Sequence, residues 1–108
     1  MRTFRISLLA GLLGAVAAPT AAAPSAADQQ ALRVRSLAAT CAQCHGTDGR
    51  AAPDSMVPRL AGRPEAATAE VLLAFKAGTR AATVMTQLVK GYSDVQIRQL
   101  AAYFAAQR

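Results

Sequence analysis

The chain has 108 residues, of which 53% are hydrophobic, with twelve Lys or Arg against six Asp or Glu. This length suits one small domain. The formal charge of +6 falls to +4 when residues 1–27 are set aside, because Arg2 and Arg5 belong to that segment. So modest a basic excess argues against nucleic acid as a partner.

The first segment has the pattern of a secretory signal peptide. Arg2 and Arg5 are followed by 13 mainly apolar residues (6–18) and then by a stretch of mostly small residues (19–27). The apolar run is shorter than the ~20 residues that span a bilayer. We therefore expect a cleaved signal peptide at 1–27, a periplasmic protein, and no membrane span in the mature form. An uncleaved membrane anchor is the alternative.

Cleavage is expected after Ala22, Ala23 or Ala27, and Pro24 disfavours the cut after Ala23. A cut after Ala27 leaves 81 residues, which form the predicted domain 28–108. A core this small usually needs additional support, such as a disulfide or a bound cofactor.

The first predicted helix covers residues 28–40. Leu32, Leu37 and Ala38 supply its apolar positions, and Asp28 is a candidate N-cap. This helix leads directly into the most informative motif of the chain.

Cys41-Ala42-Gln43-Cys44-His45 has the spacing of a c-type haem attachment site. In such a site the thiols of Cys41 and Cys44 add to the two vinyl groups of one haem c. The ring of His45 then faces the iron as an axial ligand, with its second nitrogen oriented by a backbone acceptor.

Other interpretations of this motif are weaker. A zinc site needs a fourth ligand, and an acidic residue would have to supply it because the chain has no other Cys or His. A thioredoxin-like redox pair needs a βαβ unit, and no strand is predicted. A structural disulfide leaves the adjacent His45 unexplained.

The rest of the chain predicts an all-α fold. Residues 46–63 lack periodicity and form a loop. A helix is expected from Pro64, its first helical position, to just before Gly78, with Ala67, Val71, Leu72 and Phe75 as its apolar stripe. Residues 79–92 are irregular apart from one turn at 86–89. Ser93 and Gln96 then form a capping box for a last helix with buried positions at Ile97, Leu100, Ala101 and Phe104.

Two methionines could supply the sixth iron ligand. Met56 lies in the loop after the motif, whereas Met85 lies 40 residues past His45 between two predicted helices. Thioether sulfur is a soft ligand that suits haem iron and raises its reduction potential. We favour Met85, and core packing is the alternative role for a lone methionine.

With these features, nearly the whole segment after residue 27 resembles a class I cytochrome c, with three to five helices around one covalently attached haem. The resemblance implies that Pro58 gives its carbonyl oxygen to the Nδ1–H of His45, which also places the nearby Met56 on the histidine side. It further implies that the first and last helices cross, bringing Leu37 to Leu100, Tyr103 and Phe104.

A finer resemblance involves residues 75–85, 90–94 and 100–104, including the stretch Lys-Gly-Tyr-Ser-Asp. This arrangement is similar to the cytochrome subunit of flavocytochrome c sulfide dehydrogenase and to bacterial di-haem cytochromes. It implies an electron-transfer protein rather than an enzyme, with a flavoprotein subunit or another redox protein as its partner. The alternatives are a free soluble carrier between respiratory complexes, or a haem enzyme or sensor with an open sixth position.

Several polar residues have no assigned role in this scheme. Thr79 and Thr83 are candidates for hydrogen bonds near a haem propionate, and the sequence does not choose between them. Tyr92 could line the haem or a partner surface, although packing is the simpler role. Five basic residues could form a docking face, although solvated surface is the simpler interpretation: Arg59, Arg63, Lys76, Arg80 and Lys90.

Overall fold

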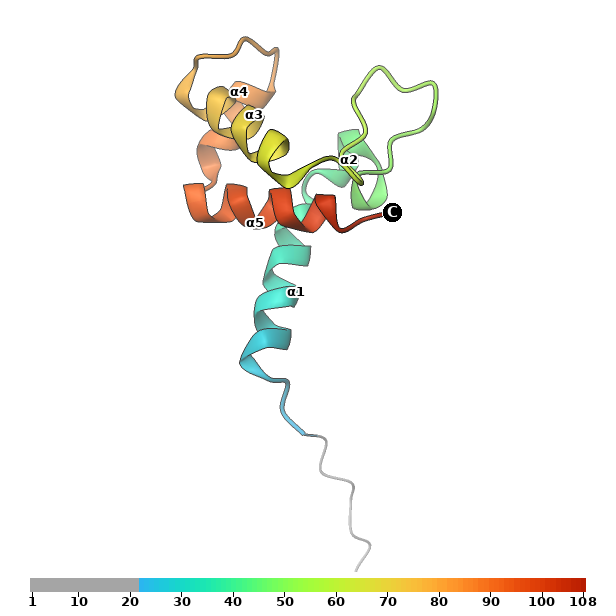
Figure 1. Ribbon diagram of the computed structural model, residues 1–108, viewed down its shortest axis with the longest axis vertical. Helices are drawn as coiled ribbons and strands as arrows, with labels where there is room; N and C mark the ends of the chain where they lie inside the picture. The colour runs from blue at the N-terminus through green and yellow to red at the C-terminus, as the bar shows by residue number, and fades with distance from the viewer. Residues whose placement is uncertain (1–21) are drawn as a thin grey trace, which may run out of the picture.

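The computed structural model of the protein describes residues 22–108, so the predicted signal segment lies outside the described residues except for its last six positions. Within this range the fold is all-α, as predicted, with no strand (Figure 1). None of the described helices combines the length and the apolar character needed to cross a bilayer. The elements are α1 (Ala26–Ala39), α2 (Ala42–His45), η1 (Thr47–Gly49), α3 (Glu65–Ala77), α4 (Met85–Leu88), η2 (Val89–Gly91) and α5 (Asp94–Ala105).

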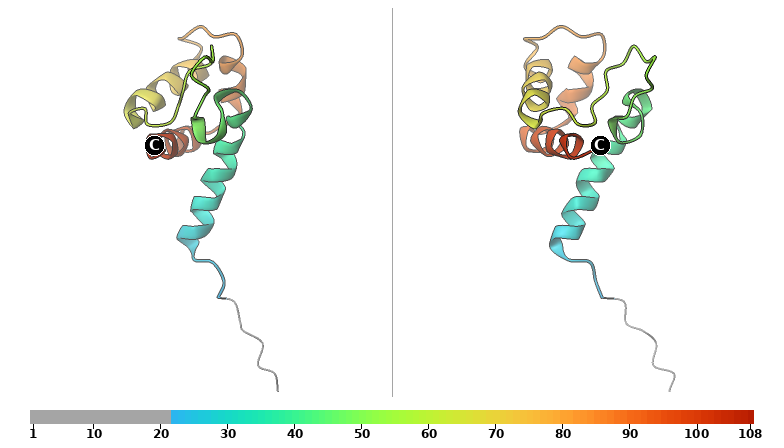
Figure 2. Two further views of the ribbon diagram at one scale, coloured as in Figure 1. Left: turned by 90° about the vertical axis from the view of Figure 1, so that its right-hand side faces the viewer. Right: turned by 45° about the vertical axis from the view of Figure 1, so that its right-hand side comes forward.

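Helix α1 begins two residues earlier than predicted. Ser25, rather than Asp28, is the N-cap, and the Ser25 Oγ accepts a hydrogen bond of 3.1 Å from the Asp28 backbone N–H. The Asp28 carboxylate in turn accepts from the Ser25 backbone N–H at 3.1 Å, which completes a capping box. This hydrogen bonding lowers the pKa of Asp28. The N-terminal half of α1 extends away from the other helices, so only its last turns reach the core (Figures 1 and 2).

The core forms where α1 meets α5, as the predicted crossing requires. Ala38 is buried with Leu100 and Phe104, and Leu37 and Tyr103 pack against this cluster. The rings of Tyr103 and Phe104 meet edge to face with centroids 5.3 Å apart. The predicted buried face of α5 is confirmed, because Ile97, Leu100, Ala101 and Phe104 are all buried.

Helix α3 has the predicted end but a slightly rotated buried face. Gly78 follows it in the left-handed conformation, while Pro64 is the N-cap rather than the first helical residue. Ala67 is exposed and its neighbours Thr68 and Ala69 are buried, which corrects the predicted stripe at that position. Helix register is set by packing, and α3 lies against both α5 and the segment of α4 and η2.

The segment before α5 contains more helix than expected. One turn was predicted at 86–89, whereas α4 covers Met85–Leu88 and η2 continues to Gly91. The capping box of α5 is confirmed: the Ser93 Oγ accepts from the Gln96 N–H at 3.2 Å, and the Gln96 Oε1 accepts from the Ser93 N–H at 2.8 Å.

Candidate functional site

The Cys-x-x-Cys-His motif forms a single tight helical turn. Cys41 is the N-cap of α2 and His45 is its last residue, with only 7% of its surface exposed. Gly46 then leaves the helix at φ +78°, and a Cβ atom there would lie 2.4 Å from the Arg50 carbonyl oxygen. The chain can therefore turn back immediately after His45 only because residue 46 is glycine.

The His45 ring is held by Pro58. Its Nδ1 lies 2.7 Å from the Pro58 carbonyl oxygen, the partner implied by the resemblance. A carbonyl oxygen can only accept, so Nδ1 carries the proton and donates it to this bond. The arrangement leaves Nε2 as the nitrogen with a lone pair, which is the tautomer that a metal ligand requires.

These residues open onto a cavity of about 490 Å³ enclosed by α2, α3, α4, η2 and α5. Its walls are mainly apolar and include Val71, Leu72 and Phe75 of α3 and Ile97 and Leu100 of α5. Cys41, Cys44 and His45 all line it. The residues of the motif and the hydrophobic faces of the helices therefore line the same cavity.

Both candidate methionines line this cavity, but they differ in environment. Met85 is half-buried and begins α4, where short helical structure holds it. Met56 is fully exposed and lies two residues from Pro58, on the loop that already holds His45.

The chemistry of this cavity fits a haem c. A haem needs a broad apolar slot, two nearby thiols, one imidazole with a free Nε2, and cations near its two carboxylates. Cys41 and Cys44 are not joined in a disulfide, and burial raises the pKa of the Cys41 thiol. Arg63 and Arg80 also line the hollow. Within residues 22–108, His, Cys, Asp and Glu side chains do not gather in the threes that the zinc interpretation needs.

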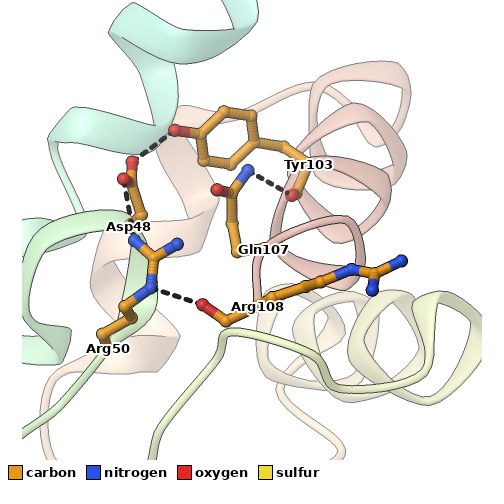
Figure 3. A network of polar contacts seen from close by, with 5 residues as sticks. All are labelled: Asp48, Arg50, Tyr103, Gln107 and Arg108. Carbon is orange, nitrogen blue, oxygen red and sulfur yellow. Dashed lines mark hydrogen bonds and ion pairs between the residues drawn. The ribbon is translucent and has the colours of Figure 1, made fainter.

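A polar network braces the haem-attachment segment against the C-terminal helix (Figure 3). Asp48, at φ +54°, accepts a hydrogen bond of 2.5 Å from the Tyr103 hydroxyl and pairs with Arg50 at 3.0 Å. The Arg50 Nε donates to the Arg108 carbonyl oxygen at 2.7 Å. The Tyr103 bond and the Arg50 guanidinium lower the pKa of Asp48, and the same bond raises that of Tyr103.

Backbone contacts complete this brace. The N–H groups of Leu60 and Ala61 donate to the Gly49 carbonyl oxygen at 2.9 and 3.0 Å, and the Gly62 N–H donates to the Phe104 carbonyl oxygen at 2.9 Å. The loop that carries Pro58 is therefore tied to both η1 and α5. The sequence indicated a loop here but gave no sign of these long-range bonds.

Tyr92 has a packing role and also lines the cavity. Its hydroxyl lies 2.6 Å from the Thr40 Oγ1, which joins the end of α1 to the segment before α5. The ring packs against the core cluster.

The five basic residues have different surroundings. Lys76 pairs with Asp94 at 2.6 Å, which lowers the pKa of Asp94, and the Arg80 guanidinium lies 5.4 Å from the Phe75 ring centroid. Arg59 and Lys90 are exposed, whereas Arg63 is half-buried in the cavity wall. The sequence analysis considered Arg63 only as one of five possible docking residues. It did not single out Thr68, which is buried and is also part of the cavity lining.

Comparison with known proteins matches the chain to cytochromes c. Residues 25–104 match the family described as cytochrome c oxidase, cbb3-type, subunit III. The chain is 36% identical over 97 residues to the cytochrome subunit of sulfide dehydrogenase from Chlorobaculum tepidum, an alignment that covers 90% of this chain and 86% of that protein.

Longer relatives match over part of their length. The chain is 36% identical over 108 residues to cytochrome c4 of Pseudomonas aeruginosa, covering 100% of this chain but 50% of that protein. It is also 36% identical over 104 residues to the thiosulfate dehydrogenase electron acceptor of Thiomonas intermedia, covering 96% of this chain and 43% of that protein. Among solved structures, cytochrome c4 of Acidithiobacillus ferrooxidans superposes with a TM-score of 0.64 at 30% identity, over 70% of this chain and 49% of that one.

Proposed function

This chain belongs to the cytochrome c family described as cytochrome c oxidase, cbb3-type, subunit III, and we propose that it accepts electrons from a flavoprotein sulfide dehydrogenase in the periplasm. It is an electron-transfer protein of the class I cytochrome c type and carries one covalent haem c. Bound haem supplies a single iron that cycles between the ferrous and ferric states, one electron at a time.

In this proposal His45 and Met85 would hold the haem iron. The observation that carries the proposal is the 2.7 Å contact from His45 Nδ1 to the Pro58 carbonyl oxygen, beside a cavity lined by both cysteines and by Met85. With Nδ1 engaged, Nε2 is the donor toward the iron. Met85 is favoured over Met56 because it is half-buried on a helical segment, whereas Met56 is fully exposed.

If both residues hold the iron, no coordination position is left for a substrate. The task of the protein would then be to fix His45 and Met85 and to keep water from the apolar slot. The bonds that tie the Pro58 loop to η1 and α5 would hold His45 and its carbonyl partner in place when the iron gains or loses an electron.

The flavoprotein partner is proposed from the likeness to the Chlorobaculum tepidum subunit, which this chain matches over most of its length. The test is to purify a tagged chain from its native periplasm and record its absorption spectrum with and without sulfide. We expect a flavin chromophore in a fixed ratio to haem, and reduction of the haem by sulfide. Elution of a haem-bearing monomer that sulfide does not reduce contradicts the proposal.

A free soluble carrier is the second candidate. The likeness to the thiosulfate dehydrogenase electron acceptor of Thiomonas intermedia favours it, together with the net charge of +4 outside residues 1–27, which would steer weak encounters with acidic partners. A monomer that exchanges electrons with a respiratory oxidase, without a tightly bound partner, is the result that supports this function.

A further inference from the structure

The segment that carries Met85 buries little of its own surface. Within residues 79–92 only Val89 is buried, and the four-residue helix α4 has no buried residue. A helix of one turn is not stable by itself in water, because it makes too few hydrogen bonds to offset the cost of ordering its backbone. The position of Met85 therefore depends mainly on how this segment is attached to the rest of the fold.

At its start the segment is attached to α3. The backbone N–H groups of Thr79 and Arg80 donate to the Ala74 carbonyl oxygen at 3.0 and 3.3 Å. Helix α3 also contacts α4 and η2. These contacts fix the segment to one wall of the cavity, and they do not involve α2, which carries the haem-attachment motif.

At its end the segment is attached to the haem-attachment motif through Tyr92. The Tyr92 hydroxyl lies 2.6 Å from the Oγ1 of Thr40, the residue that directly precedes Cys41. The Thr40 hydroxyl donates its one hydrogen to the Leu37 carbonyl oxygen at 2.7 Å, so Tyr92 is the donor in the bond between the two side chains. Thr40 and Tyr92 also line the cavity.

This bond is a singular link in the fold. Within the part of the chain that the structure describes, no other hydrogen bond or ion pair joins residues 22–63 to residues 79–93. The first range contains the haem-attachment motif, and the second contains Met85. Without the bond, the two ranges are held together only by packing and by their separate attachments to α3 and α5.

We propose that Thr40 and Tyr92 are positioning residues for Met85, because their hydrogen bond holds the segment of α4 and η2 beside the haem-attachment motif. This inference rests on the proposed role of Met85 as a ligand of the haem iron. Met85 begins α4, and η2 follows α4 directly. The Tyr92 N–H donates to the Val89 carbonyl oxygen at 3.1 Å, which continues the hydrogen bonding of η2 up to Tyr92. Fixing Tyr92 therefore restricts the movement of Met85.

Loss of the bond should raise the population in which this segment is open. A single hydrogen bond typically changes an equilibrium constant by a factor of about 2 to 12. The open state exposes the backbone N–H groups of residues 84–91 to exchange with solvent, and it leaves a coordination position of the iron free for an added ligand. Hydrogen exchange and the affinity for such a ligand should therefore rise by the same factor.

The first measurement is hydrogen exchange of residues 84–91 in the haem-bound ferric protein. We expect Tyr92→Phe and Thr40→Val each to speed exchange there by about 2- to 12-fold. Thr40→Ser keeps the hydroxyl and should restore the parent rate. The double variant should resemble the single variants, because the same bond can be lost only once. Tyr103→Phe is the matched control, since it loses a tyrosine hydroxyl that bonds Asp48 instead, and it should leave exchange in this segment at the parent rate.

The second measurement is the affinity of each ferric protein for added imidazole, followed by absorption spectroscopy. Tyr92→Phe and Thr40→Val should bind imidazole about 2- to 12-fold more tightly than the parent, and Met85→Ala should bind it more tightly still. Unchanged exchange in residues 84–91 or unchanged imidazole affinity in Tyr92→Phe overturns the proposal, as does an equal change in Tyr103→Phe.

The Met85→Ala variant separates this inference from the ligand assignment on which it rests. If Met85→Ala binds imidazole no more tightly than the parent, the assignment of Met85 is wrong, and the role proposed for Thr40 and Tyr92 falls with it. If Met85→Ala binds imidazole more tightly but Tyr92→Phe does not, the assignment stands and only the positioning role is overturned. No partner protein takes part in either measurement, so failure of the flavoprotein proposal leaves both results unaffected.

Discussion

The Tyr103 hydroxyl donates a 2.5 Å hydrogen bond to Asp48, joining two residues that are 55 positions apart in the chain. Asp48 lies three residues past the proposed ligand His45, and Tyr103 lies on the C-terminal helix. The contact therefore fixes the segment that carries the haem ligand to the most buried helix of the fold (Figure 3).

Tyr103→Phe should remove stability that depends on the Asp48 carboxylate. The folded state lowers the pKa of Asp48 from its ordinary 3.8, so the carboxylate contributes stability above that pH and loses it as the pH falls through the folded value. We expect the variant to melt at a lower temperature than the parent at neutral pH. Only the ionised Asp48 carboxylate makes a strong hydrogen bond with Tyr103. The difference in melting temperature between the variant and the parent should therefore shrink below about pH 4.

Thermal melts of both holoproteins at several pH values check this prediction. Asp48→Asn provides the matched control, because it removes the charge and keeps the shape, and it should abolish most of the pH dependence of the Tyr103→Phe effect. An equal difference in melting temperature between Tyr103→Phe and the parent at pH 3 and pH 7 would contradict the assigned role of Asp48.

Gly49→Ala should destabilise the fold strongly. Gly49 has φ +75°, and a Cβ atom there would lie 2.8 Å from both the Leu60 Cβ and the Phe104 Cδ1. Left-handed backbone strain and overpacking together predict a loss of about 2 kcal/mol or more. Gly91→Ala is the control, because Gly91 is exposed and nothing lies within 4 Å of its added Cβ. Chemical denaturation measures the free energy of unfolding of both variants. Equal values would show that Gly49 packs less tightly against Leu60 and Phe104 than described.

Met85→Ala should remove the proposed sixth ligand. The expected results are loss of the methionine-to-iron absorption band in the ferric protein and a lower reduction potential, because thioether ligation raises the potential. Met56→Ala should leave both unchanged, since Met56 is fully exposed. Optical spectra and potentiometric titration distinguish the two residues, and the opposite pattern would transfer the ligand role to Met56.

The N-terminus of the exported protein should lie upstream of Ser25. A cut after Ala27 would remove the Ser25 N-cap and place an ammonium group at the positive end of α1, whereas a cut after Ala22 or Ala23 retains the capping box. Intact-mass measurement on the periplasmic protein identifies the cut, and a mature chain that begins at Asp28 would refute this preference.

Local signals explain what the sequence could predict. The haem-attachment motif, the ends of α3 and the capping box of α5 each depend on residues within one or two turns. The start of α1 was missed because Ser25 is hidden among small residues that resemble a signal peptide. The buried face of α3 was shifted because packing, and not periodicity alone, decides whether Ala67 or Thr68 is buried. The burial of Thr68 depends on how α3 packs against α5, which no local pattern encodes.

The apolar cavity beside α5 affects the stability of the protein before haem is attached. The buried cluster of Ala38, Leu100 and Phe104 is small, and α3 and η2 both line the cavity. A newly exported chain without haem would fill this space with water and leave Val71, Leu72 and Phe75 without a stable packing surface. We expect such a chain to be cleaved by proteases more readily than the haem-bound protein. Attachment of the haem to both cysteines would therefore complete the core, so that haem attachment and folding depend on each other.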